Sequence, residues 1–135
     1  MMIIKLVLVL AIALAAMNLN AQQKAFSRLS AYEFLEKIEE LTASEAEFEI
    51  IDVRTLQEFN AGHIENALQI DFYAHDFAAK LDELPKDKQY LIYCRSGRRT
   101  DITLQIMQKL NFINVVDMHY GIKSWMTENL ELITE

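Results

Sequence analysis

Along the chain, segments with the hydrophobic pattern of a strand take turns with segments that have the hydrophobic pattern of a helix. Short, β-branched apolar runs predict buried strands over residues 48–53, 67–70, 90–93 and 112–116. Amphipathic stretches with a helical period predict helices over residues 31–42, 55–62, 73–84, 100–110 and 122–129. This alternation implies a single α/β domain in which helices cover both faces of a central, mostly parallel sheet.

Side chains within these segments indicate where two helices begin and what the helices bury. Segments 30–33 and 55–58 each place a hydroxyl residue three positions before Glu, the order of a capping box at a helix start. Ile102, Ile106 and Leu110 share one apolar face of the fourth predicted helix. The large side chains expected in the core are Phe34, Phe59, Phe77 and Trp125.

The first residues of the chain have the order of a secretory signal peptide. A weakly basic start with Lys5 precedes an uninterrupted apolar run over residues 6–17, and a polar stretch containing the small residue Ala21 follows. This run is shorter than the roughly 20 residues that a membrane-spanning helix needs. We therefore expect a signal peptide at 1–21 and a mature domain at 22–135 that is periplasmic or secreted and free of the membrane. The alternative is an uncleaved N-terminal anchor.

Composition and charge exclude several classes of protein. A chain of 135 residues with 52% hydrophobic and 24% charged residues is long and apolar enough to fold as one domain. Its net charge of −7 argues against binding to nucleic acid. Cys94 is the one cysteine, so the chain forms no internal disulfide and no multi-thiolate zinc site. His75 and His119 have no partner at ligand spacing, so we expect no metal site.

Cys94 begins a basic loop between a predicted strand and a predicted helix, at the sheet edge where ligands bind in α/β proteins. Three of the chain's five Arg residues lie within the next five positions. Gly97 permits a tight turn, and the backbone N–H groups of such a loop and helix start attract anions. We therefore expect Cys94 to be a nucleophile, held as a thiolate in an anion cradle. The expected cradle residues are Arg95, Ser96, Gly97, Arg98, Arg99 and Thr100.

The loop resembles the active-site loop of the rhodanese family. Residues 94–99 read Cys-Arg-Ser-Gly-Arg-Arg, similar to the family's C-R-S-G-x-R, and Thr100 follows where the family has Ser or Thr. Segments 51–59, 62–67 and 121–125 resemble, in this order, the family's DVR…EF, GHIPGA and GGxxxW motifs. Together the motifs extend over most of the chain, and in this order and spacing they are highly specific.

The resemblance implies a single-domain rhodanese-like fold and a two-step sulfur transfer without a metal or organic cofactor. Cys94 would take sulfane sulfur from thiosulfate or a similar small anionic donor and hold it as a persulfide. A thiophilic acceptor, either cyanide or a thiol, would then remove the sulfur, and a protein is a further candidate acceptor. Asp52 would orient the loop, Arg54 would pair with a nearby carboxylate, and His63 would be a hydrogen-bonded residue at a helix end.

Three positions depart from the family pattern. Tyr120 stands where the family has the first Gly of its Gly-Gly pair, and a phenol there is expected to line or narrow the pocket mouth. Glu65 replaces the usual Pro after His-Ile, which concerns the stiffness of that loop. Arg98 occupies the variable position of the active-site loop, where its charge favours doubly anionic donors.

Several alternatives share the same residues. A Cys-dependent phosphatase or arsenate reductase uses C-x5-R, whereas here the sixth residue after Cys94 is Thr100 and Arg99 comes one position early. A non-catalytic module could carry a persulfide on Cys94 to a partner protein. An exported thiol could sense oxidants, although the chain has no second Cys to resolve a sulfenic acid. The simplest alternative is a buried structural Cys beside a solvated basic loop.

Overall fold

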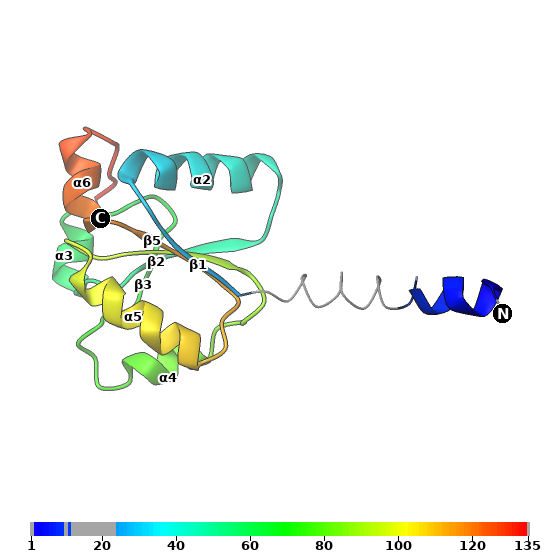
Figure 1. The fold of residues 1–135 in the computed structure, drawn as a ribbon. Coiled ribbons are helices and arrows are strands. Elements are labelled where there is room, and N and C mark those ends of the chain that lie inside the picture. The colour runs from blue at the N-terminus through cyan, green and yellow to red at the C-terminus, as the bar shows by residue number, and fades with distance from the viewer. Residues whose placement is uncertain (1, 10, 12–23, 135) are drawn as a thin grey trace.

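The structure, a computed structural model, describes residues 2–9, 11 and 24–134 (Figure 1). Residues 2–9 are helical, and their apolar side chains are exposed. Most of the predicted apolar run and the predicted cleavage site after Ala21 lie outside the described residues. Within the described ranges, no helix is both long and apolar enough to cross a lipid bilayer.

In the described part of the chain, five parallel strands form one sheet, which confirms the expected α/β class. The strands are β1 (Ala25–Leu29), β2 (Phe48–Asp52), β3 (Leu68–Gln69), β4 (Gln89–Tyr93) and β5 (Asn114–Met118). They lie in the order β1-β5-β4-β2-β3 across the sheet. Because β4 lies between β5 and β2, the residue that follows it stands at the middle of the sheet's carboxyl edge.

Helices cover both faces of this sheet. They are α2 (Ala31–Ala43), α3 (Leu56–Asn60), α4 (Phe77–Asp82), α5 (Arg98–Lys109) and α6 (Gly121–Thr127). Figure 1 shows α2 and α6 on one face and α4 and α5 on the other. The start of α5 and all of α6 lie at the same end of the molecule, beside the carboxyl ends of the strands (Figure 1).

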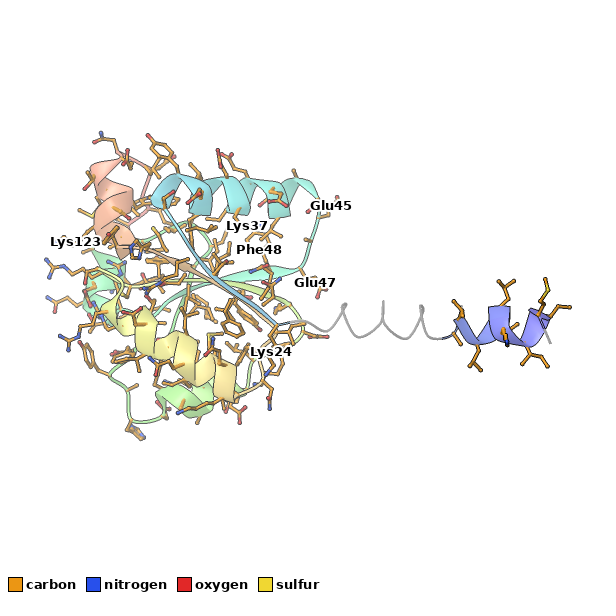
Figure 2. The ribbon with its side chains drawn as sticks, in the orientation of Figure 1. Lys24, Lys37, Glu45, Glu47, Phe48 and Lys123 are labelled. Carbon is orange, nitrogen blue, oxygen red and sulfur yellow. The ribbon has the colours of Figure 1, made fainter. Side chains whose placement is uncertain are left out.

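Strand side chains alternate between two hydrophobic cores, because successive residues of a strand point to opposite faces. Ile92 of β4 packs on the side of α4 and α5 with Met107, and its neighbour Leu91 packs on the side of α2 and α6. Side chains fill the space between the sheet and both helix layers (Figure 2). All of the aromatic residues expected in the core are buried: Phe34, Phe59, Phe77 and Trp125.

Both predicted capping boxes are present. In the first, the Ser30 N–H donates to Glu33 Oε2 at 2.8 Å, and the Glu33 N–H donates to Ser30 Oγ at 3.3 Å. In the second, Thr55 and Glu58 exchange the same pair of bonds at 3.1 and 3.3 Å. These caps satisfy N–H groups that have no partner inside the helix, and they begin α2 and α3 where the sequence predicted.

The predicted bounds of the last strand, 112–116, are wrong: β5 begins two residues later, at Asn114, and ends at Met118. The chain leaves α5 through Asn111, whose φ of 67° lies in the left-handed region. The Phe112 N–H then donates to the Met107 carbonyl at 3.1 Å, so Phe112 closes the helix end instead of entering the sheet. Its buried apolar ring made it look like a strand residue.

Two helix predictions also need correction. The helix predicted over 73–84 begins only at Phe77, because residues before it form turns, one of them held by the Tyr73 N–H donating to Asp71 Oδ1 at 2.9 Å.

The buried face of α5 also differs from the prediction: Ile102 is 44% exposed, whereas Thr103 is fully buried. The Thr103 hydroxyl donates to the Arg99 carbonyl at 2.9 Å, so its burial leaves no unsatisfied donor.

The sequence pattern did not predict β1. Its five residues, Ala25–Leu29, show no apolar alternation, and β1 is an edge strand with neighbours on one side only. It pairs with β5 in parallel, with Arg28 beside Asp117. Tertiary pairing, and not local β propensity, therefore determines this strand.

Candidate active site

Cys94 follows β4 directly and is almost completely buried, with 1% of its surface exposed. Its Sγ accepts a hydrogen bond from the Gly97 N–H at 3.1 Å, and the Thr100 hydroxyl lies 3.7 Å from it. The loop that contains these contacts curls tightly, since Gly97 has a φ of 99°. The sulfur therefore lies at the N-terminal end of α5, where first-turn N–H groups have no partner inside the helix.

The residues expected in the cradle divide into two groups. Gly97 and Thr100 are buried at the base of the loop, where both contact the sulfur. Arg95, Ser96 and Arg98 are exposed. Within the described part of the chain, the Arg95 and Arg98 guanidinium groups form no ion pair, so both cations are available to an anion that approaches the loop.

Unlike Arg95 and Arg98, Arg99 is held by a carboxylate. Its two terminal nitrogens donate to the two Glu58 carboxylate oxygens, each at 2.8 Å. The guanidinium also lies over the Tyr73 ring, 5.5 Å from its centroid. The hydrogen bond from Arg99 lowers the pKa of Glu58 to about 2. Since the same Glu58 caps α3, this ion pair connects the segment after β2 to the first turn of α5.

The expected supporting residues Asp52 and Arg54 pair with each other. Arg54 Nη2 donates to Asp52 Oδ2 at 2.6 Å and to the Gly62 carbonyl at 2.7 Å. Both side chains are buried, at the carboxyl end of β2. The nearby carboxylate that Arg54 was expected to find is therefore Asp52 itself. The pair connects β2 to the segment at Gly62, and among the described residues none of its hydrogen bonds is to the Cys94 loop, so the expectation that Asp52 orients the loop stays a prediction.

The start of α6 holds the other side of the loop, a role that the sequence analysis missed. The Ile122 N–H donates to the Cys94 carbonyl at 2.8 Å, and the Lys123 N–H donates to the Arg95 carbonyl at 3.1 Å. Gly121 makes this approach possible: a Cβ on it would lie 2.5 Å from the Cys94 oxygen. The sequence signal that could have indicated this role is Gly121 itself, which begins the segment 121–125 that resembles the family's GGxxxW motif, 27 residues after Cys94.

Tyr120 lies directly before this contact and next to the loop. Its φ of 63° is left-handed, and its backbone nitrogen is 3.4 Å from the position of a Cβ on Gly97. Its side chain is 64% exposed and contacts the His119 ring at a centroid distance of 3.8 Å. The expectation that the phenol lines the pocket mouth stays a prediction, but its backbone stands beside the loop.

His63 is buried and hydrogen-bonded, as expected. Its Nδ1 lies 2.9 Å from the Phe59 carbonyl oxygen, and its ring stacks on the Phe59 ring at 3.6 Å. The residues that the structure describes contain no group of three or more His, Cys, Asp or Glu side chains placed to hold a metal ion.

Comparison with known proteins identifies the family. The model of the rhodanese-like domain matches residues 30–128, which is most of the chain. The chain belongs to the rhodanese-like domain family. A sulfurtransferase of Allochromatium vinosum is 31% identical over 84 residues, which are 62% of this chain and 77% of the relative. The "Putative sulfur carrier protein YrkF" of Bacillus subtilis is 28% identical over 67% of this chain and 48% of its own length.

A solved structure supports the same assignment. The rhodanese-related protein of Thermoplasma volcanium superposes with a TM-score of 0.65 at 26% identity, over 84% of this chain and 99% of the other. The rhodanese-like fold expected from the motifs is therefore confirmed. The loop between β4 and α5 is the segment that the resemblance aligns with the family's active-site loop.

We expect Glu58→Gln to weaken folding in a pH-dependent way. The pKa of Glu58 is lowered from 4.5 to about 2 in the folded protein, so the stabilisation is fully present above about pH 5 and is lost as the pH falls toward 2. In urea unfolding at pH 7, the free energy of unfolding of the variant should be lower than that of wild type by on the order of 2 kcal/mol. This difference should shrink steadily below pH 4.5.

The matched control is Glu40→Gln, which removes an exposed carboxylate paired with Lys37 on α2. It should change stability by less than about 0.5 kcal/mol. A loss in Glu58→Gln that is the same at every pH would contradict the assigned ion pair.

Gly121→Ala should destabilise the fold. The added Cβ would lie 2.5–2.6 Å from backbone atoms of Cys94 and Arg95, and the φ of 59° is unfavourable for any side chain. We expect the free energy of unfolding, measured in urea, to fall by about 2 kcal/mol or more. Lys123→Ala is the control on the same helix, because this side chain is exposed (Figure 2). Equal stability of the two variants would disprove the close contact.

Proposed function

We propose that this protein is an exported sulfurtransferase that moves sulfane sulfur through a persulfide on Cys94. The observation that carries the proposal is the position of the sulfur, which accepts the Gly97 N–H at 3.1 Å at the free N-terminal end of α5. N–H groups that surround a thiolate also stabilise the persulfide anion that replaces it. Family membership and a sulfurtransferase relative support the reaction class.

In the proposed loading step, the Cys94 thiolate attacks the outer sulfur of thiosulfate. A new S–S bond forms to Cys94, the bond between the two sulfur atoms of the donor breaks, and sulfite leaves with the electron pair. The thiol proton goes to solvent before the attack. The exposed Arg95 and Arg98 guanidinium groups attract the doubly charged donor and stabilise the departing sulfite.

In the proposed transfer step, a thiolate or cyanide attacks the terminal sulfur of the persulfide. The bond between this sulfur and Cys94 breaks, and its electron pair restores the Cys94 thiolate. Because a thiolate or cyanide displaces the Cys94 thiolate directly and no outside oxidant or reductant takes part, the proposed reaction uses no metal or organic cofactor. The near-complete burial of Cys94 favours small donors and acceptors, or acceptors that present a protruding thiol.

A phosphatase or arsenate reductase is a poorer match to this site. Those enzymes need an Arg that clamps the phosphate, in the order C-x5-R. Here Arg99 donates both terminal nitrogens to Glu58, and the buried Thr100 occupies the sixth position after Cys94.

A sulfur carrier is the second candidate, because YrkF of Bacillus subtilis, named as a carrier, is similar over 67% of this chain. A carrier would load Cys94 by the same step and release the sulfur only to a specific protein partner.

Mass spectrometry of the whole protein tests the proposed function. After treatment with thiosulfate, wild type should gain the mass of one sulfur atom, and Cys94→Ser should gain none. Subsequent cyanide should remove the added sulfur and produce thiocyanate if the protein is an enzyme, whereas stable retention of the sulfur indicates a carrier. Failure of wild type to gain sulfur from either thiosulfate or polysulfide would disprove both candidates.

Export is tested separately. The basic start, the apolar run over residues 6–17 and the small residue Ala21 support cleavage by a signal peptidase. In a bacterial host, the protein should accumulate outside the cytoplasm, and N-terminal sequencing should begin at Gln22. Recovery of a chain that retains its N-terminal segment in the cytoplasm would contradict export and would leave the sulfur chemistry unaffected.

A further inference from the structure

A buried carboxylate lies below the Cys94 loop and takes no part in the proposed reaction. Asp117 of β5 is fully buried, and its Oδ2 accepts a hydrogen bond from Arg28 Nε at 2.7 Å. Its Oδ1 has no hydrogen-bond partner among the described residues. Burial raises the pKa of Asp117, and the nearby Arg28 and Thr100 groups oppose that shift. A buried carboxylate with one unsatisfied oxygen destabilises a fold, so another function should account for its position.

Arg28 connects this carboxylate to the active-site loop. It lies beside Asp117 in the register of β1 and β5. Its Nη2 contacts the Gly97 carbonyl oxygen at 3.4 Å and also pairs with Asp101 in the first turn of α5. The side chain is exposed, and its contact with the buried Asp117 restricts the directions in which the guanidinium can point.

The Gly97 carbonyl is the point where these contacts converge. Besides the Arg28 contact, it accepts the Thr100 hydroxyl and the Asp101 N–H, each at 3.1 Å. In a trans peptide the C=O and the next N–H point in opposite directions. Holding this carbonyl on the side of β1 therefore directs the Arg98 N–H out of the start of α5, toward the end where the Cys94 sulfur lies.

We propose that Arg28 and Asp117 are positioning residues, which hold the Gly97–Arg98 peptide in the orientation that directs the Arg98 N–H toward the sulfur of Cys94, next to the Gly97 N–H that the sulfur already accepts. Asp117 holds the Arg28 guanidinium through its hydrogen bond, and the guanidinium in turn holds the Gly97 carbonyl. The consequence for sulfur loading rests on the function proposed above. The consequence for the reactivity of the Cys94 thiol does not, because N–H groups around the sulfur favour the thiolate in any alkylation or transfer reaction.

The first test compares Arg28→Gln with wild type. The rate of Cys94 alkylation by iodoacetamide at pH 7 and the rate of sulfur loading from thiosulfate should both fall about tenfold, as expected for the loss of a charge-assisted hydrogen bond. The single cysteine makes both signals specific to Cys94. Rates within twofold of wild type would overturn the proposal. Because alkylation involves no sulfur transfer, this result is independent of whether wild type accepts sulfur from thiosulfate.

The second test separates positioning from stability. Asp117→Asn keeps the shape of the side chain and an acceptor for Arg28, but removes the buried charge. We expect its melting temperature to equal or exceed that of wild type while alkylation and loading slow about threefold, because a neutral acceptor holds the guanidinium less firmly. A purely structural role predicts instead that reactivity follows stability. Unchanged reactivity in this variant would overturn the proposed role of Asp117.

Phe34→Leu is the matched control for general destabilisation. Phe34 is fully buried in the core on the side of α2 and α6, away from the pairing of Arg28 with Asp117. This variant should lower the melting temperature and leave the alkylation rate within twofold of wild type. If it slows alkylation as much as Arg28→Gln does, the effect of Arg28 is general destabilisation and the proposal is wrong.

Discussion

The hydrogen bonds from α6 to the Cys94 and Arg95 carbonyls are the contacts on which the site depends. They join the last element of the fold to the loop after its central strand, and they place the loop between the starts of two helices. With its carbonyls bound on the side of α6, the loop can turn the Gly97 N–H toward the sulfur. Such an approach of two backbones requires a residue without a side chain, and Gly121 supplies it.

The distribution of cations follows from the same arrangement. Arg28 and Arg99 are held by carboxylates of other elements, so they connect parts of the fold around the carboxyl edge of the sheet. Arg54 is held by Asp52, two residues before it, and reaches a second segment through the Gly62 carbonyl. Arg95 and Arg98 extend from the exposed side of the loop. An acidic chain with a net charge of −7 thus presents two exposed cations beside its one thiol, and neither of them is in an ion pair with another described residue. Such a local field attracts small anions and discourages extended polyanions.

Family membership and local geometry support different parts of the functional argument. The match over residues 30–128 shows the rhodanese-like family and fold, and the similar proteins include one named a sulfurtransferase and one named a sulfur carrier. The contacts around the sulfur explain how this chain could stabilise a persulfide. Whether the protein is an enzyme or a carrier depends on the second step, in which the sulfur on Cys94 is transferred to an acceptor.

The sequence by itself determined most secondary structure, both capping boxes and the loop at Cys94, because these depend on residues close together in the chain. It did not predict β1 or the burial of Thr103 in place of Ile102, since edge pairing and helix rotation depend on tertiary packing. The tertiary structure also decided which charges pair: Glu58 meets Arg99 across 41 residues, and Arg28 meets Asp117 across 89. Ion pairs of this kind have no local signal, because their partners become neighbours only when the parallel strands align their carboxyl ends.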